Sequence, residues 1–174
     1  MENILIQNFI DVVKESQIKL GYREEKFSMY YLVSSLNRLI DKNLSKNEMI
    51  EILKNLNSPL GVLDVIEAGE DRLCITISKD GVRYVHENVE NKFLEKLIDV
   101  IRKYPVYIED IKKVFEEFSS DYVCIEQKDN DEFEYLMYFN DIDIDKYIYC
   151  IHFEMPGMAD YHRFTRQEFK KFNF

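Results

Sequence analysis

The chain has 174 residues, 46% hydrophobic and 32% charged, which fits one compact domain or two very small ones. Its formal net charge of −10 disfavours a general affinity for nucleic acids, because phosphate binding needs an excess of Lys and Arg. The chain has 12 Phe and 12 Tyr but no Trp, so its core depends on rings, half of which carry a hydroxyl that needs a partner.

The sequence shows neither a targeting signal nor a membrane segment. Its first residues lack the basic and long apolar regions of a secretory signal, and apolar runs such as Tyr135 to Phe139 span only five residues. Cys74, Cys124 and Cys150 form no CxxC pair and are interpreted as reduced, buried side chains. We therefore expect a cytoplasmic protein with no membrane contact and no cofactor.

Helices are predicted for the first third of the chain. Apolar residues recur at helical spacing over 3–20 and again over 29–40. A capping box, Ser45 with Glu48, opens a third helix that runs to about Leu56.

A hairpin and further helices are predicted next. Residues 62–67 and 73–78 have the composition of two strands around the turn at 68–71. The amphipathic pattern from Val82 to Tyr104 then predicts helix with an interruption near 88–91.

The apolar period changes in the second half of the chain. A helix is expected over 108–118, after which the apolar residues alternate, as in strands. A three-residue turn at 129–131 predicts that odd positions pair with odd positions. The odd apolar positions on three successive strands are Val123, Ile125, Phe133, Tyr135, Met137, Phe139, Tyr147, Tyr149, Ile151 and Phe153. A short fourth strand over 160–164 and a final helix, capped by Thr165 with Glu168, complete the chain.

These elements predict the α+β class. We expect a winged-helix-like helical first half, followed by an antiparallel β-meander of about four strands and a short C-terminal helix. Residues 1–90 and 91–174 are expected to form these two regions, packed as one compact unit.

One segment resembles a winged helix-turn-helix domain. The stretch LCITISKDGVRYV, residues 73–85, is similar to the last wing strand and the helix that follows it in such domains. The resemblance implies that Lys46 to Leu56 is a recognition helix. A DNA-binding or transcription-associated regulator is therefore one alternative, although acidic residues balance the basic ones here. Its expected contacts are Lys46, Asn47, Lys54, Asn55 and Arg72.

Three further segments carry a resemblance over nearly the full length. YYLVSSLNRLID at 30–41, GVRYVHE at 81–87 and YHRFT at 161–165 resemble an uncharacterised family of small cytosolic bacterial proteins, a domain of unknown function. The resemblance implies no established active site.

Common catalytic and ligand motifs are missing or incomplete. The five glycines match no nucleotide-binding spacing. His86-Glu87 starts like a zinc-protease HExxH helix, but Glu90 stands where the second His belongs. Asp141 to Asp145 starts like a calcium loop, yet Lys146 replaces the required glycine.

The strongest constellation for chemistry lies on the even positions of the predicted sheet. If 156–158 form a three-residue loop, His152 lies opposite His162, and Glu126 projects to the same side. Two imidazoles and a carboxylate could bind zinc or act as acid and base, so a small metal-dependent enzyme is a second alternative.

The same face is also partly apolar, and Tyr138, Ile148 and Phe164 on it are candidates for partner binding. Residues 106–160 contain four Lys or Arg against fifteen Asp or Glu. We therefore expect an uncharacterised bacterial protein that is a non-enzymatic interaction module. It would contact a protein partner or a second copy of itself through an acidic, aromatic-rich sheet, for example as an inhibitor that masks a basic surface.

Overall fold

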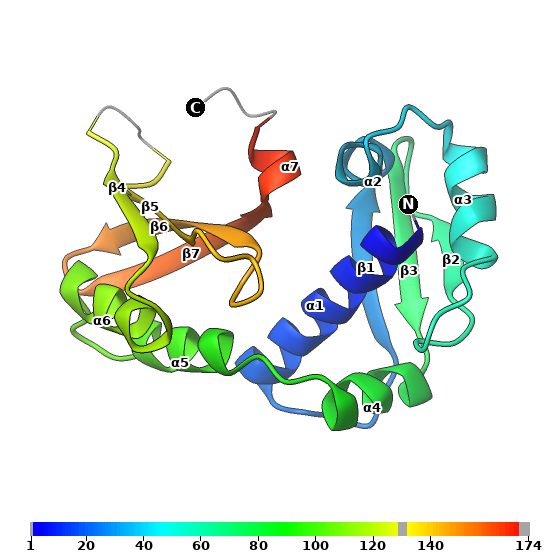
Figure 1. Cartoon of the computed structure of the whole chain (residues 1–174). Coiled ribbons are helices and arrows are strands. Elements are labelled where there is room, and N and C mark those ends of the chain that lie inside the picture. The colour runs from blue at the N-terminus through cyan, green and yellow to red at the C-terminus, as the bar shows by residue number, and fades with distance from the viewer. Residues whose placement is uncertain (1, 129–131, 171–174) are drawn as a thin grey trace. The chain divides into compact units, whose positions relative to one another are not determined.

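The computed structural model describes residues 2–128 and 132–170. The chain divides into two compact units, Met1–Glu90 and Asn91–Phe174. Its α+β class, with helices first, then a four-stranded antiparallel sheet and a short C-terminal helix, is the predicted one (Figure 1).

Residues 2–90, the described part of the first unit, form four helices and a three-stranded antiparallel sheet of order β1-β3-β2. Its elements are α1 (Glu2–Leu20), β1 (Phe27–Leu32), α2 (Val33–Ile40), α3 (Lys46–Lys54), β2 (Asp64–Glu67), β3 (Arg72–Ile77) and α4 (Lys79–Asn88). The capping box that opens α3 is present, since the Glu48 N–H donates to Ser45 Oγ and the Ser45 N–H donates to Glu48 Oε2.

Strand β1 corrects the helix predicted over 29–40. The spacing of Met29, Leu32 and Leu36 fits a helix, but only the part from Val33 onward is helical. Phe27–Leu32 is rich in aromatic residues and pairs along its whole length with β3. Pairing with a distant strand has overridden the local helical pattern.

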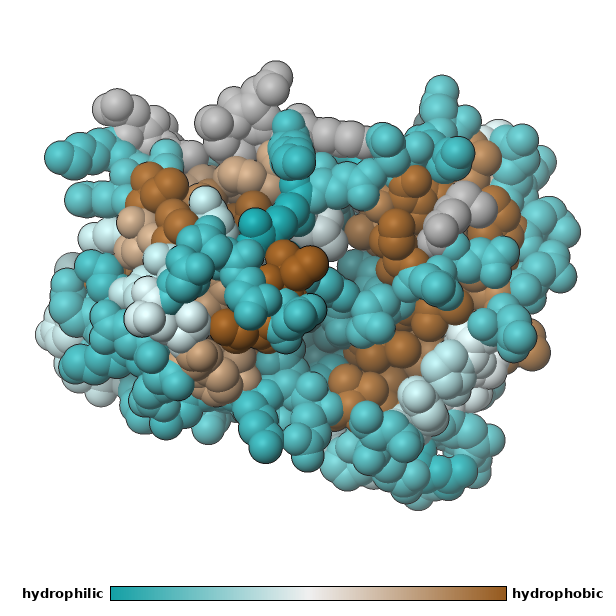
Figure 2. Space-filling model, viewed as in Figure 1, coloured by the Kyte–Doolittle hydropathy of each residue, from teal (hydrophilic) through white to brown (hydrophobic). Residues whose placement is uncertain are grey.

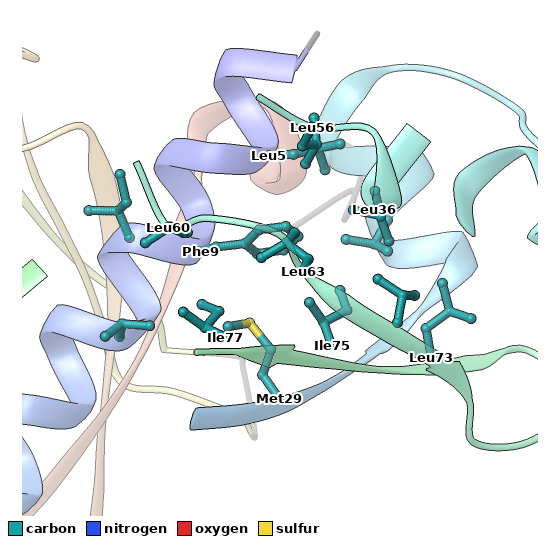
Figure 3. Packing of buried hydrophobic residues seen from close by; sticks show 14 of the residues in the cluster. Leu5, Phe9, Met29, Leu36, Leu56, Leu60, Leu63, Leu73, Ile75 and Ile77 are labelled. Carbon is teal, nitrogen blue, oxygen red and sulfur yellow. The ribbon is translucent and has the colours of Figure 1, made fainter. Parts of the chain in front are cut away.

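The core of the first unit lies between its helices and one face of the sheet. Buried side chains from α1 and α2 pack on Met29 and Ile75, and Phe9 lies among them (Figure 3). Leu20, at the end of α1, is 73% exposed and lies outside this core. On the opposite face of the sheet, Tyr30 and Ile66 are exposed on either side of Cys74.

The described residues of the second unit form three helices and a sheet of order β4-β5-β6-β7, the predicted meander. Its elements are α5 (Lys92–Ile101), α6 (Ile108–Phe118), β4 (Tyr122–Glu126), β5 (Tyr135–Phe139), β6 (Tyr147–Met155), β7 (Met158–Thr165) and α7 (Arg166–Phe169). Thr165 and Glu168 form the predicted capping box of α7.

Aromatic rings fill the space between this sheet and helices α5 and α6. Phe93 of α5 contacts Phe139 and Tyr149 edge to face, with ring centroids 4.9 and 5.5 Å apart, and Phe115 of α6 joins the same cluster. Phe169 of α7 packs on the other face, against a cluster that includes Leu136 and Ile148. Both faces of the sheet therefore have cover from the chain itself.

The pairing of β4 with β5 differs from the prediction. Tyr122 lies opposite Phe139, so odd positions of β4 share a face with even positions of β5. Val123 and Ile125 were predicted to lie on the odd-numbered aromatic face of the sheet, and this prediction is wrong. The turn expected at 129–131 lies outside the described residues.

The β6–β7 turn is fixed against the loop that precedes α6. The Val106 N–H donates to the Gly157 carbonyl oxygen at 3.0 Å, and Gly157 has a positive φ of 84°. A Cβ at this glycine would lie 2.8 Å from Pro105 Cβ, so only glycine fits without a shift. The contact brings the turn next to the start of α6.

None of the helices among residues 2–128 and 132–170 is both long and apolar enough to span a bilayer. Figure 2 shows hydrophilic side chains over much of the viewed face of each unit, with apolar patches among these side chains.

Candidate functional site

The two histidines do not lie opposite each other as predicted. His152 pairs with Asp160, and His162 pairs with Cys150, because the β6–β7 connection is shorter than the assumed loop and a bulge follows Phe153. His152 and His162 are thus diagonal neighbours on one face of the sheet, about 7–8 Å apart at the backbone.

Glu126 does not join them. It lies opposite Tyr135, which places it on the face that α5 and α6 cover. No group of three or more His, Cys, Asp or Glu side chains in the described parts of the chain is placed to hold a metal ion. The predicted trio is therefore not assembled.

The His152 ring instead contacts the carboxylate of Glu134. Its Nδ1 lies 3.0 Å from Glu134 Oε2, which also accepts the Phe153 N–H at 3.0 Å. A histidine oriented by a carboxylate can transfer protons. Cys150 does not supply a nucleophile beside this histidine, because burial raises the pKa of the Cys150 thiol to about 12 and keeps the thiol protonated.

The cysteine prediction holds for two of three side chains. Cys74 and Cys150 are buried, whereas Cys124 is half-buried, and all three are free thiols. Burial raises the pKa of the Cys124 thiol as well, which disfavours a reactive thiolate.

The side chains predicted to bind a partner share one face but are largely covered. Ile148 is buried, and Tyr138 and Phe164 are half-buried in the cluster that includes Phe169 of α7. Arg166 also lies over the Tyr138 ring, with its guanidinium carbon 5.1 Å from the ring centroid. These side chains contribute mainly to packing.

The residues considered for DNA contact lie in the first unit. Lys46 at the start of α3 forms an ion pair with Glu67 of β2, with 2.5 Å between Nζ and Oε2. Glu70 and Asp71 stand in the β2–β3 turn beside Arg72. Acidic side chains therefore accompany the cations of this surface, which weakens the attraction for a phosphate backbone.

The second unit contains a groove that the sequence did not predict as a site. The start of α6, the beginning of β5 and the β6–β7 turn line an open pocket of about 470 Å³. Its lining includes three aromatic side chains, Tyr107, Tyr135 and Phe153, together with Met155. We call this pocket the aromatic groove.

Carboxylates border the aromatic groove. Glu109, Glu134 and Glu154 line it, and the described residues of its lining include neither Lys nor Arg. Lys112 lies nearby, 4.0 Å from Glu109, at the limit of an ion pair. The Glu154 side chain is exposed, and its carboxylate forms no hydrogen bond or ion pair with the described residues.

The environment of Tyr135 reflects this charge. Burial raises the pKa of its hydroxyl, and the carboxylates of Glu126, Glu109 and Glu134 raise it further. The groove is therefore an electronegative pocket with apolar walls, suited to a cation that carries apolar groups.

The sequence contained only a coarse signal for the groove. The acid excess over residues 106–160 pointed to this region, but the ten lining residues come from three separate segments. The contact of Gly157 with the Pro105 loop brings Tyr107 close to Phe153 and Glu154, and this long-range contact has no local pattern in the sequence.

The family comparison covers nearly the whole chain. Residues 2–173 match the family described as "Domain of unknown function, E. rectale Gene description (DUF3877)". Neither the curated proteins nor the solved structures that were compared contain a match. The chain belongs to this bacterial family of unknown function, as its sequence resemblance implied.

Proposed function

We propose that this protein is a non-enzymatic interaction module whose second unit binds a basic segment of a partner protein in the aromatic groove. The observation that carries the proposal is the combination of apolar walls with three acidic residues and, among the described lining residues, no Lys or Arg. Aromatic and Met side chains are typical of the centres of protein interfaces, and complementary charge selects the partner.

The partner's charge follows from the groove's own charge. Glu109, Glu134 and Glu154 repel an acidic segment, whereas each can attract a Lys or Arg. The groove is open to water, so each such pair contributes only about 0.2–1 kcal/mol, and the rings must supply the rest of the affinity. A short basic peptide should therefore bind weakly but specifically.

Peptide titration tests the proposal. The probes are an octapeptide that alternates Gly with Lys and Arg, and its counterpart with Glu at every charged position. We expect isothermal titration to detect binding of the basic peptide alone, and the affinity to fall between 0.05 and 0.5 M salt because exposed charges are screened.

A charge reversal locates the binding surface. The double variant Glu109→Lys/Glu154→Lys should abolish binding of the basic peptide. The control Glu87→Lys/Asp99→Lys changes the net charge equally at two exposed positions outside the groove and should retain most of the affinity. Equal losses in both variants, or no binding by the wild type, would overturn the proposal.

A further inference from the structure

The aromatic groove has a corner whose geometry selects among basic side chains. The rings of Tyr135 and Phe153 are nearly perpendicular, at 82°, with their centroids 6.3 Å apart. Both rings line the groove, as does Met155 on the adjoining turn. A flat cation can stack on one ring while its edge meets the other.

Carboxylate oxygens remain available around this corner. Both hydrogen bonds that Glu134 accepts from His152 and Phe153 end on Oε2, so Oε1 accepts none from the described residues. The Phe153 N–H thereby fixes the Glu134 carboxylate against the Phe153 backbone, and both residues line the groove. Glu154, adjacent in the chain, adds a second acceptor without a partner among the described residues.

These features distinguish arginine from lysine. A guanidinium is planar, stacks on aromatic rings, and donates several N–H groups in its plane to carboxylates at the same time. A lysine ammonium is more strongly hydrated and has no flat face, so it gains less from a ring wall.

We infer that the corner formed by Tyr135 and Phe153 anchors an arginine side chain, whose guanidinium stacks on a ring and donates to Glu134 and Glu154. This inference rests on the proposed function and narrows it to segments that present an Arg. The pocket volume of about 470 Å³ exceeds the volume of one side chain, so the groove also has room for the residues that flank the Arg.

Three matched pentapeptides test the inference on the full-length chain. Each is acetylated, amidated and has two glycines on either side of a central Arg, Lys or citrulline, the last being the uncharged counterpart of Arg. Chemical-shift titrations should rank Arg first, ahead of citrulline by about tenfold and ahead of Lys by at least about twofold. Equal affinities for Arg and Lys, or for Arg and citrulline, would overturn the arginine assignment.

Variants separate the ring from the carboxylate. Tyr135→Phe keeps the ring and should keep the preference for Arg, whereas Tyr135→Ala should remove it. Glu154→Gln lies at an exposed position and should weaken Arg binding by about two- to fivefold without affecting folding. Asp99→Asn, exposed on α5, removes the same charge outside the groove and should have no effect.

The outcomes distinguish this inference from the proposed function. If neither the pentapeptides nor the basic octapeptide binds, both are wrong. If the octapeptide binds in the groove but the Arg and Lys pentapeptides bind equally, only the arginine assignment is wrong. A Glu154→Gln effect no larger than that of Asp99→Asn also contradicts the assignment.

Discussion

Asp145 is a buried carboxyl that supports the second unit at the start of β6. Its Oδ1 accepts the Tyr147 N–H at 2.8 Å, and Asn91 Nδ2, at the start of α5, lies 3.5 Å from Oδ2. The side chain therefore links the β5–β6 connection to the beginning of the unit. Burial raises its pKa, although the Tyr147 N–H and the charge of Arg163 act in the opposite direction.

The raised pKa of Asp145 predicts a pH dependence of stability. Because the folded state favours the protonated form more than the unfolded chain does, ionisation reduces the free energy of unfolding as pH rises above about 4. Asp145→Asn retains an acceptor for Tyr147 and removes the ionisation. We expect the stability of the variant relative to the wild type to increase between pH 4 and pH 7, measured by chemical denaturation. A difference that falls over this range would contradict the account.

Gly81 shows a constraint of a different kind in the first unit. A Cβ at this position would lie 2.4 Å from the Leu60 carbonyl oxygen and 2.7 Å from Ile77 Cγ2. The first turn of α4 thus packs directly on backbone atoms.

Gly81→Ala should therefore destabilise the first unit by about 1–3 kcal/mol, the cost of overpacking. Asp80→Ala, at the exposed neighbouring position, is the control and should change stability much less. Urea denaturation of both variants measures the difference, and equal midpoints would argue against the close packing.

At the scale of elements, features that depend on residues close in the sequence could be predicted, whereas features that depend on long-range contacts could not. The capping boxes at Ser45 and Thr165 were readable because each depends on two side chains three residues apart. Strand β1 was not readable, because Met29 and Leu32 fit a helical period and only pairing with β3 makes their segment a strand. The predicted pairing of His152 with His162 was wrong for a similar reason, since the bulge after Phe153 has no signature in the sequence.

Helix α7 is a short element whose cap should matter for its unit. Thr165→Ala removes the hydroxyl that accepts the Glu168 N–H, and should cost about 1 kcal/mol. Phe169 on the same helix packs against the sheet, so fraying of α7 would also uncover that face. The control is Gln167→Ala, inside the helix and away from the cap. Equal stabilities of the two variants in chemical denaturation would show that the capping box contributes nothing measurable.

At the scale of the whole molecule, composition pointed to the region of the groove but not to its residues. The acid excess over 106–160 is the net charge of a long segment, so it does not depend on which residues pair across the strands. The groove itself depends on Tyr107, Glu134 and Glu154 meeting across three elements, which required the β6–β7 turn to dock on Pro105. The predicted partner residues were instead the larger apolar side chains, which fold into the cluster under α7.

The division of the chain into two compact units predicts that the second unit can fold without the first. Each has buried hydrophobic residues of its own, such as Phe9 in the first and Phe93 in the second. We expect a fragment of residues 91–174 to unfold cooperatively and to bind the basic octapeptide as tightly as the full chain, because the whole groove lies within it. A fragment without a cooperative transition, measured by circular dichroism, would show that the second unit depends on the first.

The central claim is that the aromatic groove receives a basic protein segment. Amide chemical-shift mapping on the full chain with the basic octapeptide tests it most directly, because it reports where the peptide binds as well as whether it binds. The account predicts that the largest changes fall on the groove, at Glu109, Tyr135, Phe153 and Glu154. Changes centred on the exposed sheet face of the first unit around Tyr30 and Ile66, or spread evenly over the chain, would contradict it.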